Sequence, residues 1–359
     1  MAAYTVAIIA AGGQARVHAS GYAANDATSV VAVADPDVRA REAFCADFGI
    51  AEGYDDFDDM LEAVRPDIVS VCTPPALHRS AVMAAVRSGA RAVHCEKPVA
   101  LSYADALAMA DAAAAAGTQL SFNLQRRFDP VHRFARDAIA AGEIGDVLSL
   151  EGYCPNLLDW GSHIVDLLLF YRDDSAARWV TGQVDVTTDR YVFGAFVETS
   201  SLTEIVWEDG VRAVIATGRE PATPVLHRQT PLGLIVQGTE GRIIANGSGC
   251  TVARFDGSIS SFETPYTRDT GAWDHGIDPA IFAATESAID DLVAAVAEQR
   301  EPALSARVAV AGAEVIFATY QSSVARARVY LPLDRDATTL PQGVDLGYWR
   351  PSGRLVSNY

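Results

Sequence analysis

The hydrophobic pattern of the chain changes about a third of the way along it. Up to about residue 122, short runs rich in β-branched residues alternate with alanine-rich stretches of helical character. The runs read YTVAIIA, SVVAVAD, DIVSVCT, ARAVHCE and TQLSFN. Strands that alternate with helices in this way predict a parallel sheet covered by helices on both faces.

The pattern beyond residue 123 predicts a different architecture. Helices are expected over about 129–141 and 160–171, and alternating segments separated by turns follow from about 177 to 265. Such alternation is typical of an antiparallel sheet. Helical periodicity returns in PAIFAATESAIDDLVAAVAEQ and SARVAVAGAEVIFATYQSSVARA. The sequence therefore predicts an α/β protein with a second, α+β part.

Composition narrows the kinds of partner. The 359 residues exceed what one core usually organises, so two domains are expected. A formal charge of -18 disfavours nucleic acid and anionic membranes as partners. Five cysteines without a C-x-x-C pair suit free thiols. There is no basic leader and no apolar run of about 18 residues, and we expect a cytoplasmic protein without a membrane partner.

The turn after the first run, AAGGQARVH, resembles the phosphate turn of dinucleotide-binding folds. Against G-x-G-x-x-G/A it offers Ala10, Gly12 and Ala15, with Gly13 in addition, so only the first glycine departs from the pattern. Glycine serves here because the backbone bends tightly and approaches a pyrophosphate at a helix N-terminus. The predicted cofactor-binding residues of this turn are Gly12, Gly13, Gln14 and Ala15.

Asp35 ends the run VVAVAD, 23 residues beyond Gly12. An acid at this separation hydrogen-bonds the adenosine ribose in dinucleotide folds. Its charge would repel a 2'-phosphate, so NAD is favoured over NADP, although Arg39 and Arg41 lie close enough to soften that preference. An ordinary strand-to-helix turn followed by a surface aspartate is the alternative interpretation.

Lys97 is the one lysine among 28 basic residues. It follows Glu96 at the carboxyl end of the run ARAVHC, where open α/β sheets bind ligands. Pro98 favours an extended backbone for the lysine. A guanidinium cannot replace an amine that must rotate its donors or shift its pKa. Lys97 is therefore a candidate functional group, with a solvated surface lysine as the alternative.

A second polar cluster lies in DWGSHIVD. Asp159, His163 and Asp166 are spaced so that they share one face of a helix. The residues alone also allow a hydrogen-bonded core histidine. A metal site ranks low because a catalytic zinc needs a third protein ligand and no companion motif is present, so we predict no metal.

Several of these motifs together resemble the Gfo/Idh/MocA oxidoreductases. They are the turn at 10–18, T-P-P-x-x-H at 73–78, E-K-P at 96–98, RRFDP at 126–130 and LLDWGSHIVD at 157–166. The resemblance implies a Rossmann domain, 1–122, and an α+β domain, 123–359, with a large open, mainly antiparallel sheet. It also implies a homo-oligomer, dimer or tetramer, built through the open sheet, and a cis peptide before Pro98.

The same resemblance suggests the site. Its E-K-P lysine falls on Lys97 and its D-x-x-x-H on Asp159 and His163, as catalytic residues. It places the loop of Thr73, Pro74 and His78 against the cofactor, while Glu96 would pair with Lys97 or touch the nicotinamide ribose. Weaker candidates for the substrate pocket are Arg127 and Asn156, followed by Asn123, Tyr153, Trp273 and His275; His18 is as readily structural.

The chemistry of hydride transfer suggests a role for each of the three candidate catalytic residues. Oxidising an alcohol with NAD also releases a proton from oxygen, which needs a base within about 3 Å. His163 suits that role because imidazole titrates near neutral pH. Asp159 would orient its ring or hold a substrate hydroxyl, and Lys97 would donate to the reacting oxygen. We therefore expect an NAD-dependent oxidoreductase acting on a polyhydroxylated small molecule, a sugar, sugar derivative or cyclitol.

Two other functions remain open from the sequence. Tightly bound NAD could serve a redox-neutral elimination or hydrolysis of a glycoside, and accumulation of NADH separates that reaction from net oxidation. A non-catalytic NAD-binding regulator is the other alternative. Retention of Lys97, Asp159 and His163 argues against the regulator, and Ala10 in place of glycine argues slightly for it.

Overall fold

The protein consists of two compact units. The computed structural model describes residues 4–218, 232–247, 249–264 and 279–349. The first unit comprises residues 1–100, 105–129 and 266–310, and the second comprises 101–104, 130–265 and 311–359.

The first unit carries a parallel sheet with helices. Its strands are β1 (Tyr4–Ile9), β2 (Thr28–Ala34), β3 (Glu52–Tyr54), β4 (Ile68–Val71), β5 (Ala92–Cys95) and β6 (Gln119–Phe122). Its helices are α1 (Gly13–Ala24), α2 (Val38–Phe48), α3 (Phe57–Val64), α4 (His78–Arg87), most of α5 (Tyr103–Ala116) and α8 (Pro279–Glu298), with the 3-10 helices η1 (Pro75–Leu77) and η2 (Gln125–Phe128).

The strand order of this sheet defines where a ligand would bind. The order is β3-β2-β1-β4-β5-β6, with every pair parallel. The chain moves outward from β1 in one direction through β2 and β3, and then in the other direction through β4 to β6. Since such crossovers are right-handed, the helices fall on both faces of the sheet. The carboxyl ends of β1 and β4 flank the reversal point, where doubly wound sheets bind nucleotides.

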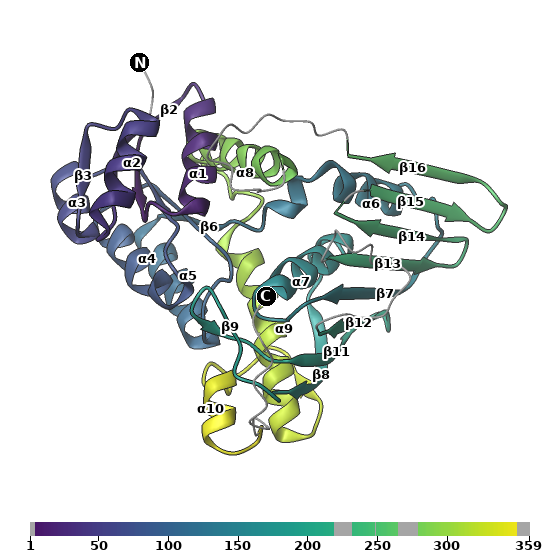
Figure 1. Ribbon diagram of the computed structural model, residues 1–359. Coiled ribbons are helices and arrows are strands. Elements are labelled where there is room, and N and C mark those ends of the chain that lie inside the picture. The colour runs from purple at the N-terminus through teal and green to yellow at the C-terminus, as the bar shows by residue number, and fades with distance from the viewer. Residues whose placement is uncertain (1–3, 219–231, 248, 265–278, 350–359) are drawn as a thin grey trace. The chain divides into compact units, whose positions relative to one another are not determined.

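The core of the first unit includes side chains of α8, a helix far along the chain. Helices α1 and α8 lie side by side (Figure 1), and Ile289, Leu292 and Val293 of α8 are buried in one cluster with the β1 and β2 side chains. Gly21 in α1 leaves the room that Ile289 fills. The sequence boundary at 122/123 assigned α8 to the second domain, because periodicity reveals an apolar face but not the core that face joins.

The second unit is built on nine strands. These are β7 (Val147–Cys154), β8 (Ala177–Asp185), β11 (Ser200–Trp207), β12 (Arg212–Thr217), β13 (Gly233–Gly238), β14 (Gly241–Asn246), β15 (Gly249–Arg254), β16 (Ile259–Glu263) and β17 (Val329–Tyr330). The hairpin β9 (Tyr191–Val192) and β10 (Ala195–Phe196) stands apart from this sheet, and the helices are α6 (Pro130–Ala140), α7 (Trp160–Tyr171), α9 (Ala306–Ala325), which begins in the first unit, and α10 (Leu340–Asp345).

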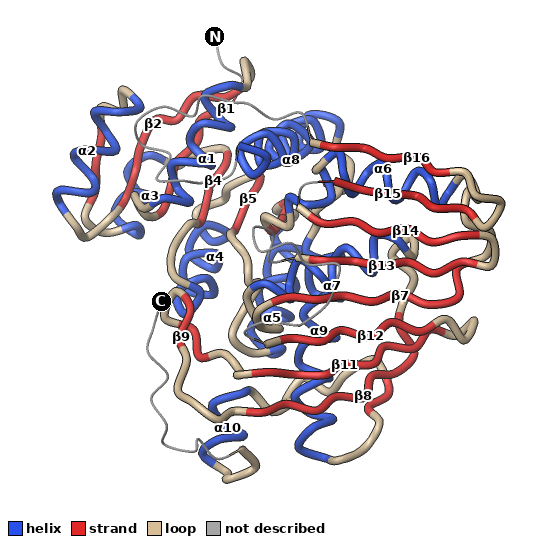
Figure 2. The backbone as a smooth tube through the Cα atoms, turned by 45° about the vertical axis from the view of Figure 1, so that its right-hand side comes forward, coloured by secondary structure: helices blue, strands red, loops and turns tan. Residues whose placement is uncertain are grey.

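The nine strands form a mixed, mainly antiparallel sheet. Their order is β16-β15-β14-β13-β7-β12-β11-β8-β17, and Figure 2 shows the run from β16 to β8. Only β7 and β12 run parallel to each other among these described strands. The predicted fold class, a parallel Rossmann sheet followed by a mainly antiparallel sheet, is confirmed.

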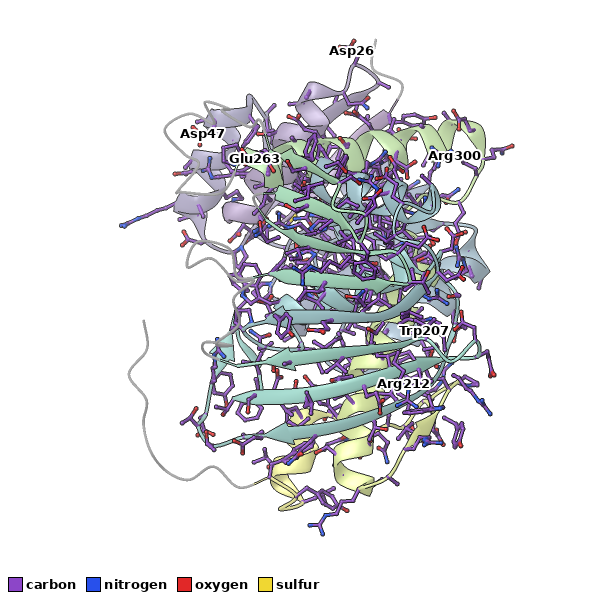
Figure 3. All side chains as sticks on the ribbon, turned by 90° about the vertical axis from the view of Figure 1, so that its right-hand side faces the viewer. Asp26, Asp47, Trp207, Arg212, Glu263 and Arg300 are labelled. Carbon is purple, nitrogen blue, oxygen red and sulfur yellow. The ribbon has the colours of Figure 1, made fainter. Side chains whose placement is uncertain are left out.

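Helices cover one face of the nine-stranded sheet. α6 packs on β14 and β15, and α7 packs on β7. Gly152 in β7 allows α7 to lie close, since any side chain there would collide with Ile164. The other face meets the viewer in Figure 3. Leu202 on β11 and Val214 on β12 are exposed, and the strand register puts both on one face of the sheet.

The long helix α9 has the composition of a core helix. An 18-residue window of this 20-residue helix has a mean hydropathy of 1.2, which by length and composition alone would suffice to cross a membrane. However, 61% of that window is buried inside the protein, including Phe317 and Tyr320. Thr319 on the same helix donates to Thr203 of β11 at 3.2 Å. The apolar face of α9 is thus covered by the sheet.

Candidate active site

The turn after β1 has the conformation of a phosphate-binding turn despite its missing glycine. Ala10 occupies the position of the first glycine and has φ +86°, in the region that favours glycine. Gly12 precedes α1 without a side-chain cap, and an added Cβ at Gly12 or Gly13 would meet nothing within 4 Å. Packing among the described residues would therefore allow a side chain at positions 12 and 13, so it does not explain why both are glycine.

Asp35 stands next to this turn. Its Oδ2 accepts the backbone N–H of Ala11 at 2.8 Å, and its Oδ1 accepts that of Asp37 at 2.8 Å. The Arg41 guanidinium donates to the backbone carbonyl of Asp35 at 2.5 Å. The carboxylate is thus held at the carboxyl end of β2, beside the N-terminus of α1.

The loops after β4 and β5 are tied together by His78. Its Nδ1 lies 2.9 Å from the Pro98 carbonyl oxygen and its Nε2 lies 3.0 Å from the Thr73 carbonyl oxygen. Burial lowers the pKa of His78, and the backbone carbonyls of Thr73 and Pro98 only partly oppose that effect. Both ring nitrogens face backbone atoms, so His78 shapes this edge of the sheet from inside the unit. Thr73 Oγ1 is buried and has no hydrogen-bond partner among the described residues.

Glu96 is buried at the carboxyl end of β5 and accepts three hydrogen bonds. His18 Nε2 on α1 lies 2.9 Å from Oε1, and Asn123 Nδ2 after β6 lies 2.8 Å from the same oxygen. The backbone N–H of Lys97 donates to Oε2 at 3.0 Å. His18 Nδ1 lies 2.8 Å from Ser70 Oγ on β4. One carboxylate therefore joins α1 to the ends of β5 and β6.

His18 and Glu96 each shift the pKa of the other toward its charged form. Burial alone would lower the pKa of His18, but the Cys72 sulfur and the Glu96 carboxylate outweigh it and raise the pKa to about 10. Burial alone would raise the pKa of Glu96, but His18, Lys97 and Asn123 lower it to about 2. His18 is fully buried, and its raised pKa together with the lowered pKa of Glu96 favours an imidazolium facing a carboxylate.

Lys97 follows directly from this network. It is half-buried, and the Lys97–Pro98 peptide is cis, in line with the family resemblance. The residue thus lies at the carboxyl edge of the parallel sheet, two strands from β1. Both groups of predicted cofactor residues, the turn at 12–15 and the loops that carry Thr73, Pro74, His78 and Glu96, belong to this edge.

The polar cluster of the second unit lies at the start of α7. Asp159 is the N-cap residue and His163 is one turn into the helix; Asp166 follows on the same face. All three side chains are buried. Asn156 Oδ1 accepts the backbone N–H of Asp159 at 2.8 Å and of Trp160 at 3.3 Å, so it caps the helix. Asn156 Nδ2 is buried without a hydrogen-bond partner among the described residues.

A carboxylate that the sequence did not single out braces the loop before α7. Glu198 is fully buried and accepts the backbone N–H of Leu157, with further hydrogen bonds from Tyr320 Oη at 3.1 Å and Thr217 Oγ1 at 3.3 Å. Burial raises the pKa of Glu198. The Arg190 guanidinium donates to the Pro155 carbonyl at 3.1 Å. An acid within the apolar alternation AFVETSS was the available signal.

The remaining candidates occupy less informative positions. Arg127 is buried in η2, and Asn123 belongs to the Glu96 network. Tyr153 donates to Glu151 on its own strand. Trp273 and His275 lie outside the described residues. The structure thus groups Lys97 with the cofactor candidates in the first unit, and Asn156, Asp159 and His163 in the second.

Comparison with known proteins identifies the lineage of this arrangement. Residues 4–124 match the family model GFO_IDH_MocA, described as an oxidoreductase family with an NAD-binding Rossmann fold. Residues 4–124 therefore carry the NAD-binding Rossmann fold of the Gfo/Idh/MocA oxidoreductases. The predicted resemblance is therefore confirmed, and the family's NAD-binding fold corresponds to the first unit without its α8 segment.

Two relatives carry the names of sugar dehydrogenases. D-glucoside 3-dehydrogenase of Escherichia coli K12 is 36% identical over 143 residues, 40% of this chain and 40% of the relative. D-apiose dehydrogenase of Paraburkholderia graminis is 31% identical over 228 residues, 58% of this chain and 59% of the relative. The chain thus matches about two fifths and three fifths of the length of these relatives.

Solved structures extend the likeness in fold to nearly the whole chain. An oxidoreductase from Agrobacterium radiobacter in complex with NAD+, L-tartaric acid and magnesium superposes with a TM-score of 0.79. The superposition covers 91% of this chain and 98% of that protein at 17% sequence identity. At this identity the likeness shows the fold alone.

Proposed function

We propose that this protein is an NAD-dependent dehydrogenase that transfers hydride between NAD(H) and a ring hydroxyl or ketone of a sugar, sugar derivative or cyclitol. The observation that carries the proposal is the setting of Lys97. The one lysine of the chain stands at the ligand-binding edge of a Rossmann sheet, and its backbone is anchored to a buried carboxylate. The sugar names of two relatives support the substrate class.

The residues of the first unit fit a dinucleotide. Gly12 and Gly13 leave open space in front of the α1 N-terminus, where the first backbone N–H groups of a helix lack partners inside it. A pyrophosphate suits that position because the helix dipole favours negative charge. Gln14 and Ala15 continue this turn, and the buried hydroxyl of Thr73 offers an unused polar atom beside Pro74. NAD, when bound, supplies the hydride acceptor.

NAD is favoured over NADP in this proposal. The Asp35 carboxylate is fixed by the backbone N–H groups of Ala11 and Asp37, and Arg41 is engaged by the Asp35 carbonyl. A fixed negative charge at the end of β2 accepts hydrogen bonds from ribose hydroxyls and repels a phosphate there. The ratio of kcat/KM for NAD to that for NADP tests this preference.

Three side chains would carry the chemistry. Lys97 donates a hydrogen bond to the reacting oxygen and stabilises negative charge that develops on it. His163 takes the proton from the substrate hydroxyl, and Asp159 orients the imidazole or holds a neighbouring hydroxyl. The buried Nδ2 of Asn156, next to Asp159 on the capping loop, supplies a donor for a further hydroxyl, with Arg127 as a second candidate.

The experiment is a panel of sugars, glycosides and inositols incubated with the protein and NAD, followed by NADH absorbance. At least one ring polyol should give NADH in amounts that rise with turnover, and His163→Asn should abolish the reaction. Substrate consumption with no net NADH would instead indicate a redox-neutral cycle. NAD binding with no consumption of any compound would contradict the proposal.

We also propose a homo-oligomer, dimer or tetramer, formed through the uncovered face of the nine-stranded sheet, and action in the cytoplasm. Exposed apolar side chains on β11 and β12 support the first suggestion. The five free cysteines support a reducing compartment.

A further inference from the structure

Glu198 is a fully buried carboxylate of the second unit that the proposed chemistry does not use. Burying a carboxylate is costly unless hydrogen bonds replace the lost water. Its Oε1 accepts the backbone N–H of Leu157 and the Thr217 hydroxyl at 3.3 Å, and its Oε2 accepts the Tyr320 hydroxyl at 3.1 Å. The Leu157 N–H belongs to the loop between β7 and α7, which carries Asn156.

The peptide groups on both sides of Asn156 are held by contacts with other residues. A peptide group is planar, so two dihedral angles set the course of the backbone at each residue. In the group after Asn156, the carbonyl oxygen accepts a backbone N–H of α7 at 2.8 Å, and the N–H of Leu157 donates to Glu198. In the group before Asn156, the Pro155 carbonyl oxygen accepts the Arg190 guanidinium at 3.1 Å. Both backbone dihedrals of Asn156 are therefore restricted.

Arg190 and Glu198 lie at the two ends of one short hairpin. β9 and β10 pair with each other between these two residues. A further backbone N–H donates to the Arg190 carbonyl oxygen at 2.9 Å and closes the base of the hairpin. The hairpin therefore sets the spacing of the two side chains that hold the peptide groups before and after Asn156.

The side chain of Asn156 is oriented as well. Its Oδ1 accepts the backbone N–H groups of Asp159 and Trp160. Because an N–H bonds only to an acceptor, the oxygen and the nitrogen of this amide are not interchangeable. Nδ2 is buried and has no hydrogen-bond partner among the described residues. A buried donor without a partner is costly, and an acceptor oxygen of a bound polyol would remove that cost.

We propose that Arg190 and Glu198 are positioning residues that aim Asn156 Nδ2 at a hydroxyl of the substrate. They hold the backbone of Asn156, so the cap on α7 and the direction of the amide donor are set together. The charge of Glu198 is not required, because a carboxylate and a carboxylic acid both offer an oxygen that accepts the Leu157 N–H. The inference rests on the proposed function, in which Asn156 binds a hydroxyl of a ring polyol.

The kinetic test compares Glu198→Leu with Glu198→Gln, using the most active compound of the sugar, glycoside and inositol panel. Leucine offers no acceptor to the Leu157 N–H, whereas glutamine keeps an oxygen for it. Glu198→Leu should raise the KM for the polyol by roughly 3- to 10-fold, while kcat and the KM for NAD change by less than about threefold. Glu198→Gln should keep the KM for the polyol within about twofold of wild type. A wild-type KM in Glu198→Leu would overturn the inference.

A second variant acts on the other peptide group through a partly exposed residue, whose loss threatens folding less. Arg190→Met should raise the KM for the polyol by roughly 2- to 5-fold. In Asn156→Ala the aimed donor is gone, so adding Glu198→Leu or Arg190→Met should raise this KM no further. A further rise of KM in these double variants would show that Arg190 and Glu198 act on another group, and would contradict the inference.

A matched control removes a buried hydrogen bond elsewhere in the second unit. Trp207 is buried at the far end of β11, and its indole N–H donates to the Ser175 carbonyl oxygen at 3.0 Å. Trp207→Phe should lower Tm and leave the KM for the polyol unchanged, because unfolding reduces the number of active molecules and not the affinity of the folded ones. An equal rise of KM in Trp207→Phe would show a general effect of instability and refute the positioning role.

Hydrogen exchange, followed by mass spectrometry, tests the positioning without a substrate. The amides of Asp159 and Trp160 report the Asn156 cap, and they should exchange roughly 3- to 10-fold faster in Glu198→Leu than in wild type or Trp207→Phe. Unchanged exchange in Glu198→Leu would overturn the inference even in an active dehydrogenase. Faster exchange in a protein that oxidises no polyol would leave the positioning of Asn156 standing and remove only the proposed function.

Discussion

Of the 28 lysines and arginines in the chain, only residue 97 is a lysine. An ammonium group rotates its three donors and fits a compact site, whereas a guanidinium is planar and larger. Lys97→Arg should therefore keep the fold and the affinity for NAD while kcat falls by roughly 100-fold or more. Steady-state assays measure the change in kcat, and titration with NADH followed by fluorescence measures cofactor affinity.

The control for Lys97→Arg is the reverse exchange at an exposed ion pair. Arg79 lies 3.2 Å from Asp105 with more than half of its side chain exposed, so Arg79→Lys should leave kcat and Tm unchanged. Wild-type turnover in Lys97→Arg would remove the lysine from the reaction.

A second single-residue prediction concerns backbone strain at Ala10. Its φ of +86° is unfavourable for a residue with a Cβ and easy for glycine. Ala10→Gly should stabilise the protein by about 1 kcal/mol, after the entropy of the added glycine is subtracted. Thermal unfolding measures the change. Ala11→Gly is the control, since Ala11 has no positive φ, and it should destabilise by about 0.5–1 kcal/mol.

At the scale of the element, a substitution at the start of α1 should affect stability and cofactor binding in opposite directions. Gly13 is the first residue of the helix, and an added Cβ meets nothing within 4 Å. Gly13→Ala should raise stability by up to about 1 kcal/mol through helix propensity, yet weaken NADH binding because the methyl group enters the space before the helix N-terminus. Tm without cofactor and Kd for NADH are the two measurements.

Gly312 provides the matched control within another helix. It lies in α9, where an added Cβ would make an ordinary contact of 3.9 Å with Val165. Gly312→Ala should raise Tm by a similar amount and leave the Kd for NADH unchanged. An unchanged Kd in Gly13→Ala as well would refute the assignment of the turn to the pyrophosphate.

The elements that sequence could predict are those with a strong local pattern. The β-branched runs correspond to β1, β2, β4, β5 and β6, and the helix predicted over 160–171 is α7 as observed. β3 was missed because Glu52–Tyr54 has three residues and no apolar run. Pairing with β2 defines that strand, and pairing is not a local property.

In the candidate site, too, the residues with a local sequence signal could be predicted, and the long-range contacts could not. Lys97 and Asp35 could be predicted because each follows a recognisable strand, and the ends of parallel strands meet at one edge. The partnership of His18 with Glu96 and the bracing of Leu157 by Glu198 could not be predicted. These contacts join residues 78 and 41 positions apart, and hydrophobic periodicity carries no information on such pairs.

At the scale of the whole molecule, the uncovered sheet face predicts the state of assembly. Leu202 is 53% exposed and Val214 is 40% exposed on adjacent strands of that face. If this face forms the oligomer, Leu202→Lys/Val214→Lys should yield monomers, because buried ammonium groups without partners are costly. Light scattering after size exclusion measures the mass. Lysines at exposed Val38 and Leu346 are the control and should leave the mass unchanged; unaltered oligomers in the first variant would place the interface elsewhere.

The stability of the whole protein should depend on pH through His18. Its pKa is raised from 6.5 to about 10 in the folded protein, so the folded state retains a proton that the unfolded chain releases above about pH 6.5. This contribution to the free energy of unfolding is fully present below about pH 6.5 and is lost as the pH rises through about 10. The loss should amount to about 2–5 kcal/mol. Urea unfolding of wild type and His18→Gln at a series of pH values measures this loss. Subtracting the free energies of unfolding of the two proteins at each pH removes groups that titrate equally in both.

The difference in free energy of unfolding between wild type and His18→Gln should shrink steadily from about pH 6.5 to about pH 9.5. A constant difference would mean that His18 is neutral in the folded state.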